Sequence, residues 1–414
     1  MRVLLTIVAL LVAATPASAQ WSPPANISSA HEFVDNPSLA FSSTGIGLTT
    51  WIARDGTGNT ATQGTFAAPL GSPERLVSRT AVISPPVLYG STRTAAARLS
   101  GNRLSIVVGR TDGSFGAPEL IADRANIRSV VLAGNQQGDL ALAWFEDRGV
   151  FTDRVYIAVR PHGHPWSPPL LQATDRVRSV SVAVSPKGAL LLAYDARGVV
   201  KARYKPATAP LFRHVQTIQS QPTFFAKLRT AVTGNGRAYI GWAAQFLSEG
   251  GDRGDGFYEV AVQPAGALKF RPAQLLEQRP SEEAVGGLDL TTNDANGATV
   301  AWGATTVKAA FTDASATFGA TQTVAPGLEA AMAGAPDGRA LVAIIAGSEE
   351  QGGLMAATSQ NGAFGAPETV TTGPEARVPA AAYDAKGNRW GLAWSNRPNG
   401  ETNPLQTFLQ TSLR

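Results

Sequence analysis

The sequence predicts an all-β fold, in which eight copies of one four-stranded antiparallel unit close into a ring as an eight-bladed β-propeller. A ring of seven blades is the alternative. Three observations point to this fold: a turn glycine that recurs about every 50 residues, an aromatic and proline segment that recurs between those glycines, and a composition poor in charge but rich in Gly and Pro. Fixed periods of about 20 to 50 residues are typical of repeat folds and propellers.

The first recurring feature is a turn glycine followed by an apolar strand that ends in a large aromatic residue. Six copies are complete: Gly45 to Trp51, Gly138 to Trp144, Gly188 to Tyr194, Gly236 to Trp242, Gly297 to Trp302 and Gly387 to Trp394. In two further copies, which begin at Gly90 and Gly338, Ala96 and Ile344 replace the aromatic residue. Successive glycines lie 45, 48, 50, 48, 61, 41 and 49 residues apart, which makes eight units.

The second recurring feature is an aromatic residue often followed by proline. Its copies are Phe66 to Pro69, Phe115 to Pro118, Trp166 to Pro169 and Phe364 to Pro367, with weaker ones at Phe212, Phe270 and Phe318. No copy follows Gly387, but Trp21-Ser-Pro-Pro24 lies near the N-terminus. We therefore expect the N-terminal segment to complete the last unit as an outermost strand, since this removes the open edge of the ring. Proline suits an outermost strand, where its missing backbone donor faces solvent.

The strands of one unit can be read from residues 179–218. Four apolar or alternating segments, 179–185, 189–195, 199–205 and 212–218, are separated by glycine turns and a proline-rich connection. Such segments indicate four short antiparallel strands. The second is almost continuously apolar, which is typical of a strand covered on both faces by neighbouring sheets. The first strand of each unit is then the innermost.

The N-terminal 19 residues have the three parts of a secretory signal: Arg2, an apolar stretch over residues 3–14, and Ala17-Ser18-Ala19. Cleavage after Ala19 is predicted, which leaves one propeller domain over residues 20–414 in a secreted or periplasmic protein. The apolar stretch is shorter than the roughly 20 residues that a membrane span needs. No later segment is apolar enough to cross a bilayer, and we expect a monomer.

The composition excludes several classes of site. The chain has no cysteine, which excludes disulfides, thiolate metal sites and a cysteine nucleophile. A chain of this size buries about three quarters of its unfolded surface and can fold without such cross-links. The net charge of +4 over 414 residues is small and no block of five basic residues occurs, so a nucleic-acid partner is not expected. No cofactor is predicted.

The candidate ligand-binding residues are basic side chains at the start of the innermost strands. Counting back ten residues from the turn glycine reaches Arg128, Arg178 and Arg377, and Lys227 lies one residue off in a fourth unit. The other units place Asp35, Thr80, Gly287 and Leu328 there. In a ring these positions converge at one mouth of the central channel, where guanidinium groups suit a carboxylate or sulfate. The alternative is that these cations are solvated strand ends.

Loops on the same face of the ring differ from unit to unit. Residues 145–154, 245–256 and 395–404 are longer and more polar than their equivalents. Binding residues often lie on such loops, although tolerated insertions give the same pattern. Two short motifs are expected to be surface turns: residues 251–255, which contain Arg253-Gly254-Asp255, and His162-Gly-His164, which lacks a third metal ligand.

The repeats resemble those of secreted bacterial β-propellers of the sialidase-like superfamily that bear Asp boxes, and the resemblance covers residues 20–414. The Asp box reads Ser-x-Asp-x-Gly-x-x-Trp, and residues 111–115 and 359–364 approach it without the full spacing. A sialidase-like hydrolase would need an arginine triad, a tyrosine nucleophile with an acid partner, and an aspartic acid. Arg128, Arg178 and Arg377 could imitate the triad, but the Arg-Ile-Pro element of that family is absent and no tyrosine follows an acidic pair at the required spacing.

The leading hypothesis is an extracellular or periplasmic binding or scaffold propeller, whose loop face takes a glycan, a peptide or an anionic polymer. The first alternative is a sialidase-like, glycan-active hydrolase. The second is a structural envelope protein, which would be marked by a large apolar patch on the outer edge of the ring. No catalytic or metal-binding residue is predicted.

Overall fold

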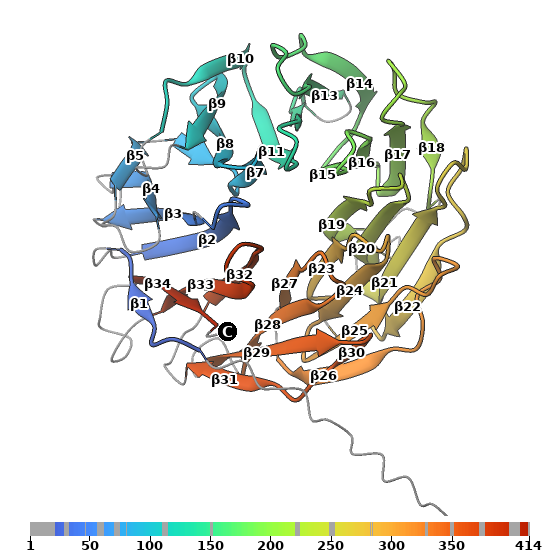
Figure 1. Ribbon diagram of the computed structural model, residues 1–414. Coiled ribbons are helices and arrows are strands. Elements are labelled where there is room, and N and C mark those ends of the chain that lie inside the picture. The colour runs from blue at the N-terminus through green and yellow to red at the C-terminus, as the bar shows by residue number, and fades with distance from the viewer. Residues whose placement is uncertain are drawn as a thin grey trace, which may run out of the picture.

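The computed structural model describes residues 21–28, 33–45, 47–55, 62–69, 75–79, 81–109, 115–149, 152–219, 224–247, 253–281, 283, 285–327, 330–347, 352–371, 377–396 and 406–412. Every regular element in these ranges is a β-strand (Figure 1). The predicted signal segment, residues 1–19, lies outside them. No helix among the described residues is long and apolar enough to cross a membrane.

The strands form eight antiparallel sheets, numbered here in chain order. Sheet one holds β2 (Phe33–Phe41), β3 (Gly47–Asp55), β4 (Thr62–Pro69) and β5 (Arg75–Arg79). Sheet two holds β6 (Ala81–Ile83), β7 (Val87–Tyr89), β8 (Arg93–Ser100), β9 (Arg103–Gly109) and β10 (Glu119–Asp123). Sheet three holds β11 (Ile127–Gly134), β12 (Leu140–Glu146), β13 (Asp153–Arg160) and β14 (Leu170–Asp175). Sheet four holds β15 (Val180–Val184), β16 (Leu190–Ala196), β17 (Val199–Lys205) and β18 (Gln216–Thr217).

The second half of the chain repeats this arrangement. Sheet five holds β19 (Phe224–Val232), β20 (Ala238–Leu247), β21 (Arg253–Gln263) and β22 (Gln274–Arg279). Sheet six holds β23 (Gly287–Thr292), β24 (Ala298–Gly303), β25 (Thr306–Phe311) and β26 (Gln322–Pro326). Sheet seven holds β27 (Ala330–Gly334), β28 (Ala340–Ala346), β29 (Gly353–Gln360), β30 (Ala363–Phe364) and β31 (Glu368–Thr371). Sheet eight holds β32 (Arg377–Asp384), β33 (Arg389–Asn396), β34 (Gln406–Thr411) and β1 (Ala25–Asn26).

The sheets stand around a common centre (Figure 1). The strands nearest to it are β2, β7, β11, β15, β19, β23, β27 and β32, and each contacts its counterpart in the next sheet, with β32 against β2. This all-β arrangement of four-stranded antiparallel sheets is consistent with a β-propeller.

The N-terminal segment is the outermost strand of sheet eight. Ala25 pairs with Leu409 in β34, and Trp21 forms a further antiparallel bridge with Ser412. The amide of Ser22 donates a hydrogen bond of 2.9 Å to the carbonyl of Thr411. The two ends of the described chain therefore share one sheet, as the position of Trp21-Ser-Pro-Pro24 led us to expect.

The turn after each innermost strand contains a residue with a left-handed backbone conformation. The recurring glycine predicted the position of that residue in all but two sheets. Gly45, Gly138 and Gly236 have φ of 82°, 94° and 84°. In sheets six and eight the positive φ instead falls on Asn296 (66°) and Asn388 (49°), each beside the glycine that was predicted to carry it. Asparagine tolerates this region because its short polar side chain can bond the local backbone.

The core lies between adjacent sheets. The aromatic residues that end the second strands are almost fully buried, at no more than 1% exposure: Trp51, Trp144, Trp242, Trp302 and Trp394. Every residue of β12 and of β16 is buried, which fits second strands that are covered on both faces.

The outer strands depart from the prediction in part. Only Gln216–Thr217 of the expected strand 212–218 forms a described strand pair with β17, although the amides of Arg213 and Ile218 also donate hydrogen bonds of 2.8 Å to β17 carbonyls. The aromatic and proline segments lead into the outermost strands in several sheets, since Trp21, Phe115, Phe318 and Phe364 each pair with the end of a third strand. Residues 66–69 instead end β4, which is itself a third strand.

The two short motifs had different outcomes. Residues 253–255 lie in β21, so the expectation of a solvated turn was wrong for them. Asp255 Oδ2 accepts a hydrogen bond of 2.7 Å from the side-chain amide Nε2 of Gln278 on the neighbouring strand. His162-Gly-His164 is an exposed turn, as predicted.

Candidate functional site

Three of the four candidate cations occupy the same register position in their sheets. Arg128, Lys227 and Arg377 each pair with the residue that follows the tryptophan of the second strand, at Phe145, Ala243 and Ser395 respectively. Asp35 and Gly287 take this position in sheets one and six. The pairing places these backbones at one height, at the end of the ring where the innermost strands begin.

A bulge explains why Lys227 is one residue out of step in the sequence. In β11 the extra residue lies between Arg128 and Val131, on the turn side of the cation. In β19 it lies between Phe225 and Lys227, on the other side. An extra residue in one strand changes the count along the sequence, while the residues beyond the bulge keep their register.

Arg178 does not occupy that position. The first residue of β15 is Val180, and the amide of Asp195 donates to the carbonyl of Ser179, so Ser179 is the register equivalent of Arg128. Arg178 precedes it with an exposed side chain, and its backbone amide donates a hydrogen bond of 3.1 Å to Asp195 Oδ1.

A cavity of about 320 Å³ lies among the first residues of the innermost strands, and it is bounded by β2, β19, β23, β27 and β32 together with Pro85. Of the four candidates, Lys227 lines it. Arg128 and Arg178 do not, and the side chain of Arg377 lies outside the described part of the chain, although Pro379 in the same strand lines the wall.

Among the described residues, the charged side chains that line this cavity are Lys227, Arg229 and Asp289. Arg229 Nε lies 3.3 Å from Asp289 Oδ1, and Asp289 Oδ2 accepts a hydrogen bond of 2.9 Å from the amide of Met332 in sheet seven. The aspartate is thus held by groups from two neighbouring sheets. Lys227 is exposed, and no hydrogen bond or ion pair joins it to another described residue.

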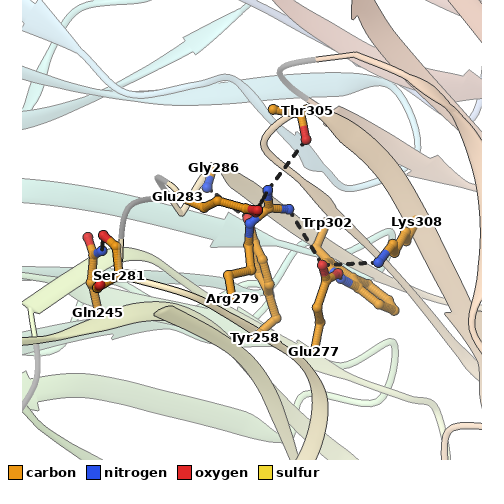
Figure 2. A network of polar contacts seen from close by, with 10 residues as sticks. All are labelled: Gln245, Tyr258, Glu277, Arg279, Ser281, Glu283, Gly286, Trp302, Thr305 and Lys308. Atoms are coloured by element: carbon orange, nitrogen blue, oxygen red, sulfur yellow. Dashed lines mark hydrogen bonds and ion pairs between the residues drawn. The ribbon is translucent and has the colours of Figure 1, made fainter. Parts of the chain in front are cut away.

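Sequence reasoning missed a polar network at the junction of sheets five and six (Figure 2). The guanidinium of Arg279, only 6% exposed as a residue, contacts the carboxylates of Glu277 and Glu283. Glu277 also accepts hydrogen bonds from Trp302 Nε1 (2.7 Å) and Lys308 Nζ (3.0 Å). These charges satisfy one another across two sheets, so the network is a clamp rather than an open binding site.

The same region contains a buried tyrosine. The amide of Gly286 donates a hydrogen bond of 2.7 Å to the hydroxyl oxygen of Tyr258, and burial raises the pKa of Tyr258 to about 12. Burial likewise raises the pKa of Tyr194 to about 12. A nucleophile requires a hydroxyl that ionises more easily, so neither tyrosine suits the role that a sialidase-like reaction would give it.

Two buried carboxyl groups in sheets three and four were also missed. Glu146 is fully buried, and Arg148 Nη2 donates to its Oε2 at 2.9 Å. Asp195 is also fully buried. Its Oδ2 has no hydrogen-bond partner in the described structure, and desolvation raises the pKa of Asp195 to about 6, with a smaller opposing contribution from the Arg178 amide. No three His, Cys, Asp or Glu side chains are grouped to hold a metal ion within the described ranges.

No protein-family model and no curated protein matches the chain. Solved structures with some likeness include a protein of unknown function from Dyadobacter fermentans, at 11% identity over 94% of this chain and 98% of that chain, with a TM-score of 0.46. A polysaccharide lyase shares 11% identity over 78% of this chain and 90% of its own, with a TM-score of 0.46. A Hadza microbial sialidase shares 11% identity over 77% and 73%, with a TM-score of 0.38. Likeness at this level assigns no activity.

Proposed function

We propose that the protein is an exported binding module, an eight-bladed propeller closed by β1, which holds an anionic group of a glycan or anionic polymer at the mouth of its central channel. The observation that carries the proposal is the ammonium of Lys227 on the wall of the central cavity, which pairs with no other residue that the structure describes. Closure is supported by the eight sheets, by the contact of β32 with β2, and by the pairing of β1 with β34.

Charge in the cavity favours an anion. Asp289 already offsets the charge of Arg229, so Lys227 leaves the lining with an excess positive charge. An ammonium group donates short, charge-assisted hydrogen bonds to carboxylate or sulfate oxygens. Arg128 and Arg377 share the register position of Lys227, and in a closed ring they would extend the basic surface around the same mouth.

The size of the cavity limits what enters it. Small-ligand sites commonly occupy about 300 to 1,000 Å³, and this one, at about 320 Å³, lies at the lower end. It fits one acidic sugar unit or one sulfate-bearing end of a longer chain. The rest of a polymer would lie across the face where Arg128 and Arg178 are exposed.

The test is a glycan array followed by titration calorimetry with carboxylated and sulfated oligosaccharides. We expect Lys227→Met to weaken binding of the best ligand by about tenfold, because one charge-assisted contact is lost. Lys269→Met is the matched control, since Lys269 is an exposed lysine between β21 and β22, away from the channel. Equal affinities of the parent protein and Lys227→Met, or a preference for neutral sugars, would contradict the proposal.

A fluorogenic sugar panel separates binding from hydrolysis. We expect no turnover by a tyrosine nucleophile at Tyr194 or Tyr258, because both side chains are buried away from a substrate. Turnover that Lys227→Met abolishes would replace the binding module with an enzyme at the same cavity.

A further inference from the structure

A second hollow lies on the outer rim, at the junction of sheets three and four and away from the innermost strands. Its volume is about 580 Å³. The wall from sheet three comes from β14 and the segment before it, and the wall from sheet four comes from β17 and the connection after it. The lining side chains include Leu170, Leu171, Leu211, Phe212, Arg203 and Lys205.

The groove exists because sheet four has a very short outermost strand. β18 contains only Gln216–Thr217, and the proline-bearing connection before it is tied to β17 by the hydrogen bond from the Arg213 amide to the Tyr204 carbonyl. Leucine side chains remain uncovered as a result: Leu211 is 73% exposed, Leu171 50% and Leu170 44%. Single exposed leucines are ordinary on a protein surface, whereas several around one hollow mark an interaction site.

The two cations that line the groove, Arg203 and Lys205, differ in their hydrogen bonds. Arg203 is engaged, since its Nη1 donates to Gln172 Oε1 at 2.9 Å and its Nε donates to the carbonyl of Arg213 at 3.3 Å. Lys205 is half-buried and makes no ion pair or hydrogen bond with any residue that the structure describes. Burial lowers the pKa of Lys205, and the negative charge of Asp139 opposes this shift. An occupant with a carboxylate would add a direct hydrogen-bonding partner for the ammonium group.

We propose that this groove binds an extended segment of a partner protein, which brings a carboxylate to Lys205 and apolar side chains to Leu171 and Leu211. A peptide is favoured over a free fatty acid because β14, among the described strands, pairs only with β13, so that an extended chain can add along its other edge. Two carbonyls of β14 already accept hydrogen bonds from side chains, Leu170 from Gln172 Nε2 (3.3 Å) and Gln172 from Arg203 Nη1 (3.4 Å). The site is independent of the channel mouth.

The test uses three synthetic probes with the full chain: an octapeptide that alternates leucine with aspartate, its counterpart that alternates leucine with lysine, and laurate. Fluorescence anisotropy or calorimetry measures each affinity. We expect the aspartate peptide to bind at least about tenfold more tightly than the lysine peptide. Lys205→Met should remove most of that preference, because the methionine keeps the packing of the side chain and loses the charge.

Leu211→Ser and Leu268→Ser form a matched pair of variants. Leu268 is 72% exposed, close to the 73% of Leu211, and lies in the corresponding connection of sheet five, outside the groove. Both changes should therefore affect folding equally, while only Leu211→Ser weakens the aspartate peptide. The proposal is overturned if that peptide does not bind up to about 1 mM, if Leu268→Ser weakens it as much as Leu211→Ser, or if laurate binds through Lys205 in its place.

Discussion

Arg229 and Asp289 form an ion pair at the wall of the central cavity, with 3.3 Å between Nε and Oδ1, and this pair joins sheet five to sheet six. Asp289 also accepts the amide of Met332, so its carboxylate links three consecutive sheets. The two cations that line this cavity among the described residues therefore differ. Arg229 is paired with Asp289, whereas Lys227 pairs with no other described residue.

Replacing Asp289 with alanine should lower the free energy of unfolding by about 1 to 2 kcal/mol, since a partly exposed ion pair and the hydrogen bonds from the amides of Leu290 and Met332 are lost. Urea denaturation measures the change. Asp337→Ala is the control, because the carboxylate of Asp337 is 54% exposed and bonds Arg339 within a single turn. A larger loss in the control than in Asp289→Ala would contradict the inter-sheet role.

The buried carboxyl of Asp195 predicts an unusual dependence of stability on pH. Desolvation raises its pKa from 3.8 to about 6, so ionisation is less favourable in the folded chain than in the unfolded one. Asp195 therefore favours the native state most below about pH 4. Its contribution to the free energy of unfolding declines as the pH rises from about 4 to about 6 and does not change further at higher pH. Relative to the parent, the stability of Asp195→Asn should rise by roughly 3 kcal/mol over that interval.

Thermal denaturation from pH 3.5 to 8 tests this, with Asp175→Asn as a control of opposite sign. Desolvation is the largest single influence on the pKa of Asp175 and raises it, but hydrogen bonds from the Arg176 amide, Lys201 and Arg197 together outweigh it, so the pKa is lowered. Asp175→Asn should therefore be less stable than the parent at neutral pH and equal to it in acid. Parallel curves for Asp195→Asn and the parent would rule out the raised pKa.

The clamp between sheets five and six predicts a cost for unbalancing its charges. Glu277→Gln removes a charge that faces Arg279 and Lys308, so we expect a loss of about 2 to 3 kcal/mol. Arg279→Met should cost less, since it removes the buried charge itself. Glu119→Gln, at an exposed pair with Arg160, is the control and should change little. Equal losses in Glu277→Gln and Glu119→Gln would show that the clamp adds no stability.

The sequence predicted the parts of the fold that local chemistry determines. The path from Gly138 to Trp144 is a turn followed by a buried strand, and this short pattern is enough to find a repeat. The segment at Trp21 could be assigned to the last sheet because a unit was missing there. Asn296 was not foreseen as the left-handed residue, because a neighbouring glycine offered the more obvious choice.

The site was only partly predictable. Counting from the turn glycine found Lys227 but not Arg229 or Asp289, because bulges shift the count and because an ion pair between sheets has no local signal. A turn in sheet six was also missed. Asp313 accepts hydrogen bonds from Ser315 Oγ (2.7 Å) and the amide of Thr317 (3.0 Å), but the surrounding residues lack the serine, glycine and tryptophan at their positions in the Asp box.

The pairing of β1 with β34 is the contact on which the closed ring and its shared mouth depend. Because the chain has no cysteine, a double variant with Ala25→Cys and Leu409→Cys can form only one intramolecular disulfide. These residues are directly paired across the two strands, at a spacing that a disulfide can bridge. We predict that mild oxidation gives a monomeric cross-linked product, seen as a shifted band and a single linked peptide by mass spectrometry. Free thiols, or linkage only between separate chains, would contradict the closed ring.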